Sequence, residues 1–537
     1  MRFWDKSVAL FKCVQEHGQL SIRCLAEKTG LSKSSVHRLS HAMNRRALKP
    51  ESWFWETDDG RAWLGLLVVA TLYLFGLKRG VGAETISEFF RRLHLHRHVG
   101  SSPTAIRTLL QGLETIVIET ATSWEQEGVS HGQARDIIGA VAETFFEQML
   151  LVFVDLPTGY IVMEEVAEDR RYVTWNTHVQ AQLEELGTSV RYLVSDRAKA
   201  LIQLAQQGLE CLSVPDLFHL MRDLSKGYSL AIARPLRQAR QELIKAEAAM
   251  RRHEGFDKRR GEAGVAHRHL RATQALVSKW EEARAAYRQH LEALSLTMHP
   301  FAIGDPLPQS SAQVERRLRA ELKALEALAD TYQLPAKPEV MKKVSDQVPA
   351  LAALVDFWWQ GVARDLTGLT LTPLWRRWVK EVLLPHAYWE AQLSRSRHRG
   401  QRAKISQTLE QSQERLDQHA MTRRIPARVL ADWKTWATEQ ARAFQRASSA
   451  VEGRNGYLSQ MHHNHRGLPK RRYRTWRALH NFDCHDTDGT TPASRFFRHE
   501  FPDFFEAVFA QVGELPRPRQ RKRNQHLSQS KEEVVPA

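Results

Sequence analysis

Asp196 is the residue whose type and position in this sequence best suit chemistry. It follows Val190–Val194 and Ser195, an apolar stretch that predicts a β-strand, so its carboxylate would lie at the strand's carboxyl end. Ligand sites of open α/β sheets gather at that end of the strands. Asp196 would also suit the N-cap of a helix that starts at Arg197, and the two roles are compatible.

A second group of residues suits DNA binding. Leu20–Leu39 has the pattern of a helix-turn-helix: Gly30 supplies the turn, Leu31 fills the gap between two helices and Ser32 caps the second helix. The apolar stripe of the first helix would contain Ile22, Leu25 and Ala26, and the second helix would bury Val36 and Leu39. Its outward face would contain short polar and basic side chains suited to a major groove, namely Lys33, Ser34, Ser35, His37 and Arg38. The alternative is an ordinary helical hairpin.

Residues 82–136 predict a second, weaker unit of the same kind. Thr85–Leu93 would form one helix, His94–Gly100 the turn, and Ser102–Leu113 the other helix, with Pro103 in its first turn. The turn is rich in histidine, but it has no cysteine or carboxylate partner. We therefore do not expect a metal site there.

The strands and helices that would position Asp196 can be predicted from the residues around it. Strands fit Ile137–Phe146, Met149–Val154, Gly159–Val166, Val190–Val194 and Glu210–Val214, and a helix fits Thr174–Leu186. The order βββ-α-β-α-β suggests a mixed α/β sheet in which the fourth strand lies beside the first.

The distribution of charge also sets the predicted sheet region apart from the rest of the chain. The 537 residues have a net charge of +16, yet residues 137–235, with 8 basic and 13 acidic side chains, have a net charge of −5. The flanking residues are basic, so an acidic sheet region lies inside a chain suited to a polyanion. The four cysteines show no CxxC spacing, which argues against a disulfide framework or a cysteine zinc site.

The remaining sequence is mostly helical. Residues 236–298 predict an antiparallel helical hairpin interrupted at Arg251–Gly264, and a break at Phe301–Ser311 separates it from further helices. The tryptophans of those helices are expected in their core, and the basic run Arg395–Arg402 would contact phosphates or form a solvated face. A later patch with histidines at 462, 463 and 465 would face phosphates through Arg466, Lys470, Arg471, Arg472 and Arg474.

Several strings in the chain resemble DDE transposases of bacterial insertion sequences. They are Glu143-Thr-Phe-Phe, Tyr192-Leu-Val-Ser-Asp196, Val451-Glu-Gly-Arg-Asn455 and Asp488–Phe497. The resemblance implies a ribonuclease-H-like core with one carboxylate in the first strand, one after the fourth and a glutamate on a late helix. Asp196 matches the second position and Glu452 the third, and the helical residues between them match as an insertion. Asn455, one helical turn after Glu452, could orient substrate or a metal-bound water.

The sequence departs from that family at the first carboxylate. The resemblance predicts an aspartate immediately before Glu143, but residue 142 is alanine. Either this ligand has been lost, naturally or by engineering, or Asp155 takes its place. Asp155 heads a Pro/Gly turn, where aspartate is common, so we favour Ala142 as the vacated position. Glu143 would point to the opposite face of the strand and is a poor substitute.

The resemblance also implies the chemistry. DNA cleavage and strand transfer would use two Mg²⁺ ions, for which Mn²⁺ can substitute, bound by Asp196, Glu452 and the missing first aspartate. Without that aspartate, we expect a DNA transposase that binds double-stranded transposon ends and target DNA but does not cut. A transposase-derived DNA-binding regulator, in which Ala142 is natural, is the alternative. A helix-rich nucleic-acid scaffold without catalytic ancestry is a third possibility.

These expectations give a multidomain α and α/β architecture. Its predicted segments are 1–48, a helix-turn-helix; 49–81, a linker with an apolar helix; 82–136, a second helix-turn-helix-like unit; 137–235, the first part of a ribonuclease-H-like core; 236–447, an all-helical insertion; 448–512, the rest of the core; and 513–537, a basic disordered tail. The apolar run Ala62–Leu77 is short for a membrane span, so we expect a buried helix. The resemblance also implies a cytoplasmic, nucleoid-associated bacterial protein. We expect it to form a homodimer or larger assembly and to make no contact with a membrane.

Overall fold

A computed structural model gives the fold of the chain. It describes residues 3–18, 20–46, 54–55, 57–131, 136–253, 260–335, 338–463, 470–516 and 518. The chain forms two compact units. The first contains Met1–Ala134 and Gly456–Ala537, and the second contains Arg135–Asn455. The helix α18 (Ser449–His463) begins in the second unit and ends in the first.

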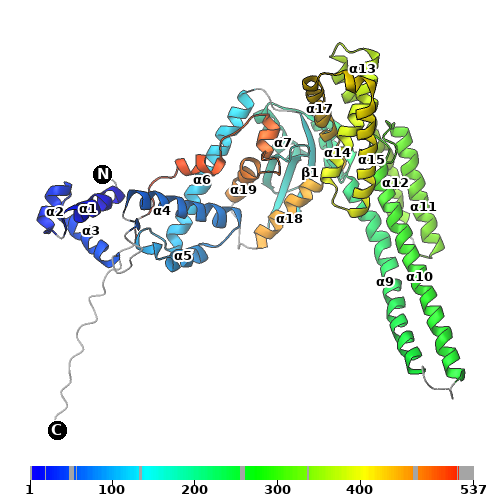
Figure 1. Cartoon of the computed structure of the whole chain (residues 1–537), viewed down its shortest axis with the longest axis horizontal. Coiled ribbons are helices and arrows are strands. Elements are labelled where there is room, and N and C mark those ends of the chain that lie inside the picture. The colour runs from blue at the N-terminus through cyan, green and yellow to red at the C-terminus, as the bar shows by residue number, and fades with distance from the viewer. Residues whose placement is uncertain are drawn as a thin grey trace, which may run out of the picture. The chain divides into compact units, whose positions relative to one another are not determined.

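The first unit opens with three short helices, α1 (Phe3–His17), α2 (Ile22–Thr29) and α3 (Lys33–Arg46) (Figure 1). Their shared core contains apolar side chains from all three helices and from the turn, namely Leu10, Cys13, Leu25, Leu31, Val36 and Leu39. This arrangement confirms the predicted helix-turn-helix and adds α1, which the pattern did not predict. One detail was wrong: Ile22 is 39% exposed, because it lies at the first position of α2, outside the core stripe.

The predicted turn chemistry of this domain is present. Gly30 ends α2 with φ +67°, a left-handed conformation that glycine adopts without steric cost. The side chain of Ser32 accepts a hydrogen bond from the backbone N–H of Ser35 at 3.3 Å, so it caps α3 as expected. These two residues set the angle at which α3 leaves the turn.

The next helix of this unit is α4 (Asp58–Thr71), which continues as a π-helical segment, η2 (Leu72–Lys78). Together they form a 21-residue helix that is long and apolar enough to cross a membrane, although half of its most apolar window is buried inside the protein. The prediction of a buried helix at Ala62–Leu77 is therefore correct for one face, while Trp63, Leu74 and Phe75 are exposed.

The long helix α6 (Pro103–Ser130) is central to the rest of the first unit. Ser102 caps it and Pro103 lies in its first turn, as predicted, but the helix extends 17 residues past the predicted end at Leu113. It packs against α5 (Ala83–Arg92), α19 (Lys470–Asp483) and α21 (Phe504–Ala510), and α20 (Pro492–Phe497) packs against α19. A 3₁₀ turn, η3 (Leu95–Arg97), follows α5.

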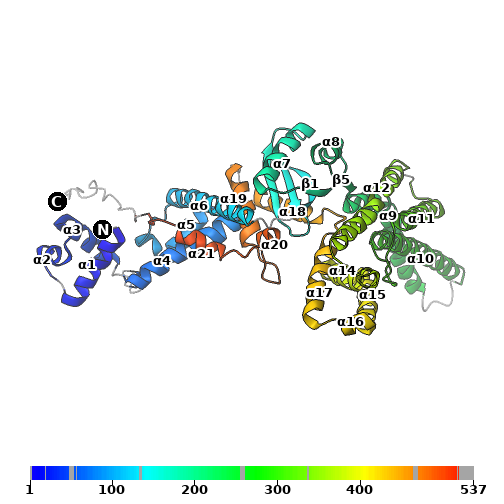
Figure 2. The same ribbon diagram turned by 90° about the horizontal axis from the view of Figure 1, so that it is seen from above.

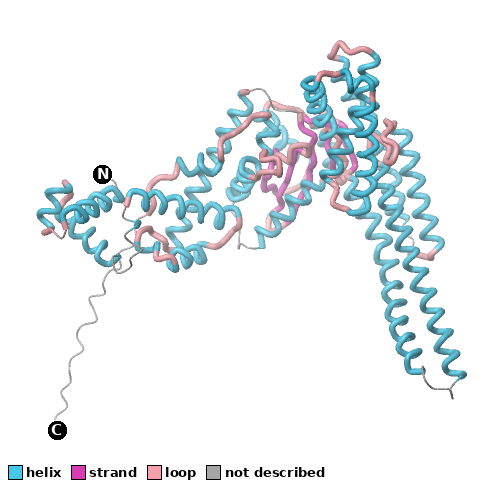
Figure 3. The backbone as a smooth tube through the Cα atoms, viewed as in Figure 1, coloured by secondary structure: helices cyan, strands magenta, loops and turns pink. Residues whose placement is uncertain are grey.

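The second unit contains a five-stranded mixed sheet with the order β3-β2-β1-β4-β5 (Figure 3). The strands are β1 (Ile137–Phe145), β2 (Met149–Asp155), β3 (Ile161–Ala167), β4 (Val190–Ser195) and β5 (Leu212–Pro215). The pairs β1–β4 and β4–β5 are parallel and the others are antiparallel. The prediction that the fourth strand lies beside the first is therefore confirmed. Three further helical segments accompany the strands: α7 (Tyr172–Leu186), α8 (Lys199–Gln203) and η4 (Leu204–Gly208).

The rest of the second unit is helical. The helix α9 (Leu217–His253) starts directly after β5 and runs antiparallel to α10 (Arg260–Thr297), which confirms the predicted hairpin (Figures 1 and 2). The remaining elements are α11 (Ser311–Thr331), α12 (Pro338–Thr367), α13 (Pro373–Trp378), η5 (Val379–Leu383), α14 (Leu384–Arg395), α15 (Arg399–Gln418), α16 (Ala420–Arg424) and α17 (Ala427–Arg442). Trp358, Trp378 and Trp389 are buried among them, as expected of tryptophans at helical spacing.

Candidate functional site

Ala142 lies in a row of residues that crosses the sheet. It pairs with Val152 of β2, and Val152 pairs with Glu164 of β3. Paired residues on neighbouring strands project from the same face of a sheet, because side chains alternate along each strand. The side chains of Ala142, Val152 and Glu164 therefore share one face.

The same row continues to the carboxyl ends of β4 and β5. Ala140 pairs with Val194 in the parallel direction, and Asp196 directly follows β4, so a register continued by two residues would bring Ala142 level with Asp196. Ser195 in turn pairs with Pro215, which makes Asp196 level with Asp216. Neighbouring strands are about 4.8 Å apart, so positions 142, 196 and 216 would follow one another at steps of about 5 Å if this register continued past the paired residues.

The helix α18 lies across this face because it is anchored at both ends of the row. Near its start, the backbone N–H of Ser448 donates to Asp216 Oδ1 at 3.1 Å, and the Ser448 hydroxyl donates to Asp216 Oδ2. One turn into the helix, Arg454 donates to Glu164 Oε2 through Nε at 3.1 Å and Nη2 at 2.6 Å, and both side chains are buried. Glu452 lies between these anchors in the sequence.

Glu452 is also tied to the end of β5 through a histidine. His219 hydrogen-bonds through Nδ1 to Asp216 Oδ2 at 2.5 Å, and its Nε2 lies 3.6 Å from a carboxylate oxygen of Glu452. The hydrogen bond to Asp216 raises the pKa of His219 above its ordinary value. Burial alone would raise the pKa of Asp216, but the hydrogen bonds from His219 and Ser448 hold it below its ordinary value. His219 thus lies between the carboxylates of Asp216 and Glu452.

Asp196 itself is exposed. Its Oδ1 accepts a hydrogen bond from the backbone N–H of Ala198 at 2.9 Å, which closes a side-chain turn rather than capping a helix at Arg197. The predicted N-cap was wrong, because α8 begins only at Lys199. Between them, Arg197 has φ +62°, an uncommon conformation for a residue with a Cβ, and such strain concentrates at functional sites.

Asp155, the other possible first carboxylate, belongs to a different part of the sheet. It pairs with Gly139, three residues before Ala142, so it faces the opposite side. Its oxygens accept hydrogen bonds from the backbone N–H of Ile138 at 2.9 Å and from the hydroxyl of Thr158 at 2.5 Å, and the side chain is fully buried. These contacts make Asp155 a turn-stabilising residue.

Glu143 shows the expected alternation. Trp175 of α7 lies beside its side chain, so Glu143 faces away from α18. Burial, followed by the negative charge of Asp196, raises its pKa above the ordinary value of a glutamate. Glu143 therefore interacts with the charge of Asp196 from the face opposite Ala142.

The residues at this sheet edge do not fit a pair of Mg²⁺ ions. Hard cations require oxygen ligands, and Asp196 and Glu452 each offer a carboxylate. The methyl group of Ala142 offers none, and the oxygens of Asp216 accept hydrogen bonds from His219 and Ser448. Ala142, on the strand between β2 and β4, therefore offers no ligand atom that two ions could share.

The DNA-binding residues predicted on α3 lie on the outer face of the helix-turn-helix. Lys33, Ser34, His37 and Arg38 are exposed, and Ser35 is half-buried next to Ser32. Val36 and Leu39 are buried at 0% and 2% exposure. The helix thus presents a polar and basic face to solvent.

The second predicted group, on α19, behaves differently. Arg472 Nη2 lies 2.5 Å from Glu114 Oε1, and Arg471 Nε lies 3.6 Å from Glu114 Oε2. The expectation that Arg472 faces phosphate was wrong, because its guanidinium is enclosed between α19 and α6. Lys470 and Arg474 are exposed, and Arg466 lies outside the described residues.

Sequence reasoning missed the residues that hold α18 on the sheet, namely Glu164, Asp216, His219, Ser448 and Arg454. Asp216 carried a usable signal, since it directly follows a short strand in the same way as Asp196. The partners of these residues are up to 290 positions away in the sequence, and no local pattern identifies them.

Comparison with known proteins identifies two segments. Residues 5–47 match the IclR helix-turn-helix domain, and residues 379–524 match a family of unknown function, DUF6399. The second match includes α18 with Glu452. None of the curated proteins compared with the chain matches it.

Proposed function

We propose that this chain is a DNA-binding protein of the DDE transposase type whose nuclease centre is disabled at Ala142. The helix-turn-helix domain, which matches the IclR type, indicates DNA binding. Its exposed α3 face would enter the major groove of double-stranded DNA. The sheet unit would descend from a ribonuclease-H-like nuclease that has kept two of three carboxylates.

One observation carries the catalytic part of the proposal. Continued by two residues, the register of β1 and β4 would bring Ala142 level with Asp196, and α18, which contains Glu452, is tied through Arg454 to Glu164 on the face of Ala142. The resemblance to DDE transposases places its three carboxylates in the first strand, after the fourth strand and on a late helix. On this proposal, Ala142 of β1, Asp196 after β4 and Glu452 of α18 correspond to those positions, and the methyl group of Ala142 stands at the first of them. A nuclease centre with this defect supports binding without cleavage.

Restoring the carboxylate tests this proposal. The DNA probe would be a duplex first selected from a random library by the full chain, so that no end sequence need be assumed. We expect the protein to bind this duplex and to leave it uncut in Mg²⁺ or Mn²⁺. Ala142→Asp should gain metal-dependent nicking by several orders of magnitude, where each tenfold gain corresponds to about 1.4 kcal/mol of barrier.

Two matched variants control that experiment. In Ala142→Asn, the asparagine has the shape of aspartate without its charge, so this variant should stay inactive. Adding Asp196→Asn to Ala142→Asp should abolish the activity that Ala142→Asp gains. Efficient cutting by the unaltered protein would contradict a disabled centre. Failure of Ala142→Asp to cut, with DNA binding and metal binding intact, would contradict the nuclease ancestry of the sheet.

The assembly and location follow from the same proposal. A protein of this type acts on two DNA ends, so we infer a homodimer or larger assembly in the bacterial cytoplasm, associated with the nucleoid. Light scattering of the protein with and without the selected duplex measures the number of chains bound. A single chain on DNA that carries two sites would contradict the inferred assembly.

A further inference from the structure

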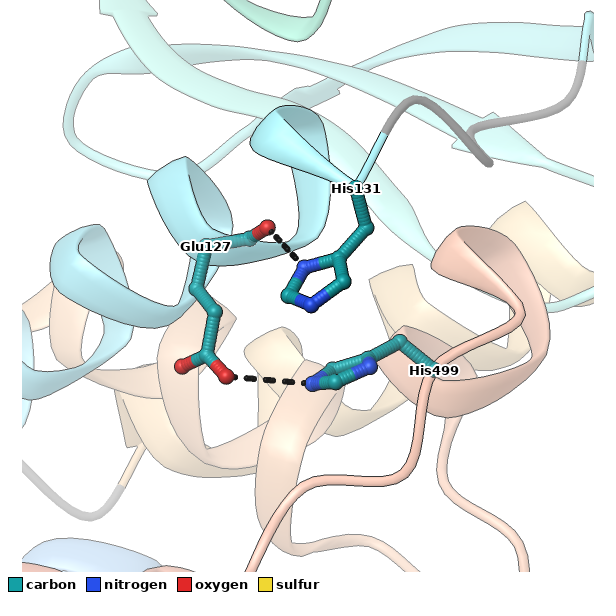
Figure 4. Close-up of side chains that lie close together, drawn as sticks. All are labelled: Glu127, His131 and His499. Carbon is teal, nitrogen blue, oxygen red and sulfur yellow. Dashed lines mark hydrogen bonds and ion pairs between the residues drawn. The ribbon is translucent and has the colours of Figure 1, made fainter.

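Two histidines and a glutamate converge in the first unit, away from the residues discussed above. Glu127 and His131 are one turn apart at the end of α6, and His499 follows α20 (Figure 4). One ligand atom from each side chain lies within 4.8 Å of the other two. Glu127 Oε1 and His499 Nε2 are 3.1 Å apart, and the rings of His131 and His499 stack with centroids 4.3 Å apart.

The arrangement of His131 is that of a metal ligand. Its Nδ1 lies 2.7 Å from the backbone carbonyl oxygen of Glu127 and donates a proton to it, because a carbonyl can only accept. The other ring nitrogen is then the unprotonated one, and Figure 4 shows it on the side of the ring toward His499. Histidines that bind metals usually donate their second nitrogen in this way, which fixes the tautomer.

His499 is held close to α6 by packing. Its ring lies edge-on to Phe501 at 4.8 Å, and Phe501 stacks on Trp124 of α6 at 5.3 Å. Phe497 approaches α6 so closely at Gly128 that an added Cβ would lie 2.5 Å from its ring. These contacts position the backbone of His499 before any ligand binds, which lowers the entropic cost of binding one.

We propose that Glu127, His131 and His499 bind a zinc ion or a similar transition-metal dication. Two imidazoles and one carboxylate form a frequent zinc ligand set, whereas Mg²⁺ prefers oxygen ligands alone. Tetrahedral bonds of 2.0–2.1 Å place ligand atoms about 3.3 Å apart, close to the separation of Glu127 and His499. Imidazole nitrogens bind metals in the plane of the ring, so the stacked rings of His131 and His499 must rotate for both nitrogens to face one ion, and water would fill the fourth position. The ion would fasten the segment after α20 to the end of α6.

Metal titration of the full chain tests this site. The protein, with any histidine tag removed and after treatment with a chelator, is titrated with Zn²⁺ alone by calorimetry. We expect one ion per chain and a rise in the unfolding temperature of the first unit. Co²⁺ in place of Zn²⁺ should give the intense visible absorption of a four-coordinate site.

Three variants decide whether these residues are the ligands. His131→Ala and His499→Ala should each weaken Zn²⁺ binding at least about tenfold. Glu127→Gln keeps an acceptor oxygen for His499 but removes the charge, so it should fold normally and still lose affinity. His178→Ala, which changes a histidine of α7 outside the group, should bind like the unaltered protein. Absence of stoichiometric Zn²⁺ binding, or unchanged affinity in the three ligand variants, would overturn the proposal.

Discussion

Two helices of the first unit have basic residues near their amino-terminal ends, and they use these charges in different ways. On α3, Lys33 and Arg38 are exposed, whereas Val36 and Leu39 on the opposite face pack into the domain core. On α19, Arg471 and Arg472 form ion pairs with Glu114 of α6. The first helix offers its charges to a partner molecule, and the second uses two of them within its own fold.

The difference lies in the position of each charge relative to the apolar stripe of its helix. Arg472 is four residues before Trp476 and seven before Leu479, so it shares the buried face of α19. Arg38 lies between the core residues Val36 and Leu39 but points to another side of α3. The spacing of a charge from the buried residues, rather than the number of charges, therefore predicts which cations can reach DNA.

The largest effect should come from removing Arg472. Arg472→Ala leaves Glu114, which is only 3% exposed, with Arg471 at 3.6 Å as its remaining cation. Breaking a buried ion pair from one side destabilises by roughly 3–5 kcal/mol, and we expect about 3 kcal/mol here because Arg471 remains. Urea unfolding followed by tryptophan fluorescence measures this loss.

Lys470→Ala is the matched control for that change. Lys470 is exposed on the same helix, and its removal should alter the free energy of unfolding by less than about 0.5 kcal/mol. If the two variants were equally stable, the distinction between the α3 and α19 charges would be unfounded.

The sheet shows how much of this fold local patterns can predict. Apolar runs, alternation and turn residues identified the five strands of this sheet within a few positions, and the order of the elements predicted that β4 lies beside β1. Local patterns also gave the cap at Ser32 and the turn at Gly30. They predict these features because each depends on residues a few positions apart.

Features that depend on distant residues were not predictable in this way. The anchors of α18 join Ser448 to Asp216 and Arg454 to Glu164, and the partner of Arg472 is on α6. Each contact forms only after the helices pack. Sequence reasoning thus placed Asp196 and Glu452 as candidate ligands, but the register of the sheet, continued past its paired residues, was needed to bring Ala142 level with Asp196 and to separate it from Asp155.

A smaller effect is expected on DNA affinity when Arg38 is changed. Arg38→Ala should weaken binding of the selected duplex by about 1–3 kcal/mol if the side chain contacts a base, and should lower the salt slope by about one if it contacts a phosphate. Gel-shift titrations at several salt concentrations measure both quantities. Arg472→Ala, assayed where it remains folded, should bind DNA like the unaltered protein. Equal loss in the two variants would remove the contrast between the helices.

The smallest effect is a pH dependence that originates at Glu114. Burial raises the pKa of Glu114 above the ordinary glutamate value, and Arg472 and Arg471 offset this only in part. The folded state therefore holds the carboxyl proton more tightly than the unfolded chain does, so this group adds stability as the pH falls through its folded pKa.

Glu114→Gln lacks the titration, and the unaltered protein should gain stability relative to it between pH 7 and about pH 4.5. Urea unfolding of both proteins across that range measures the difference, and a gain in the opposite direction would show that the ion pairs outweigh burial. In that case the attraction between Glu114 and the arginines of α19 would exceed the cost of burying the carboxylate. Arg472 would then contribute more to stability than its contrast with the exposed cations of α3 implies.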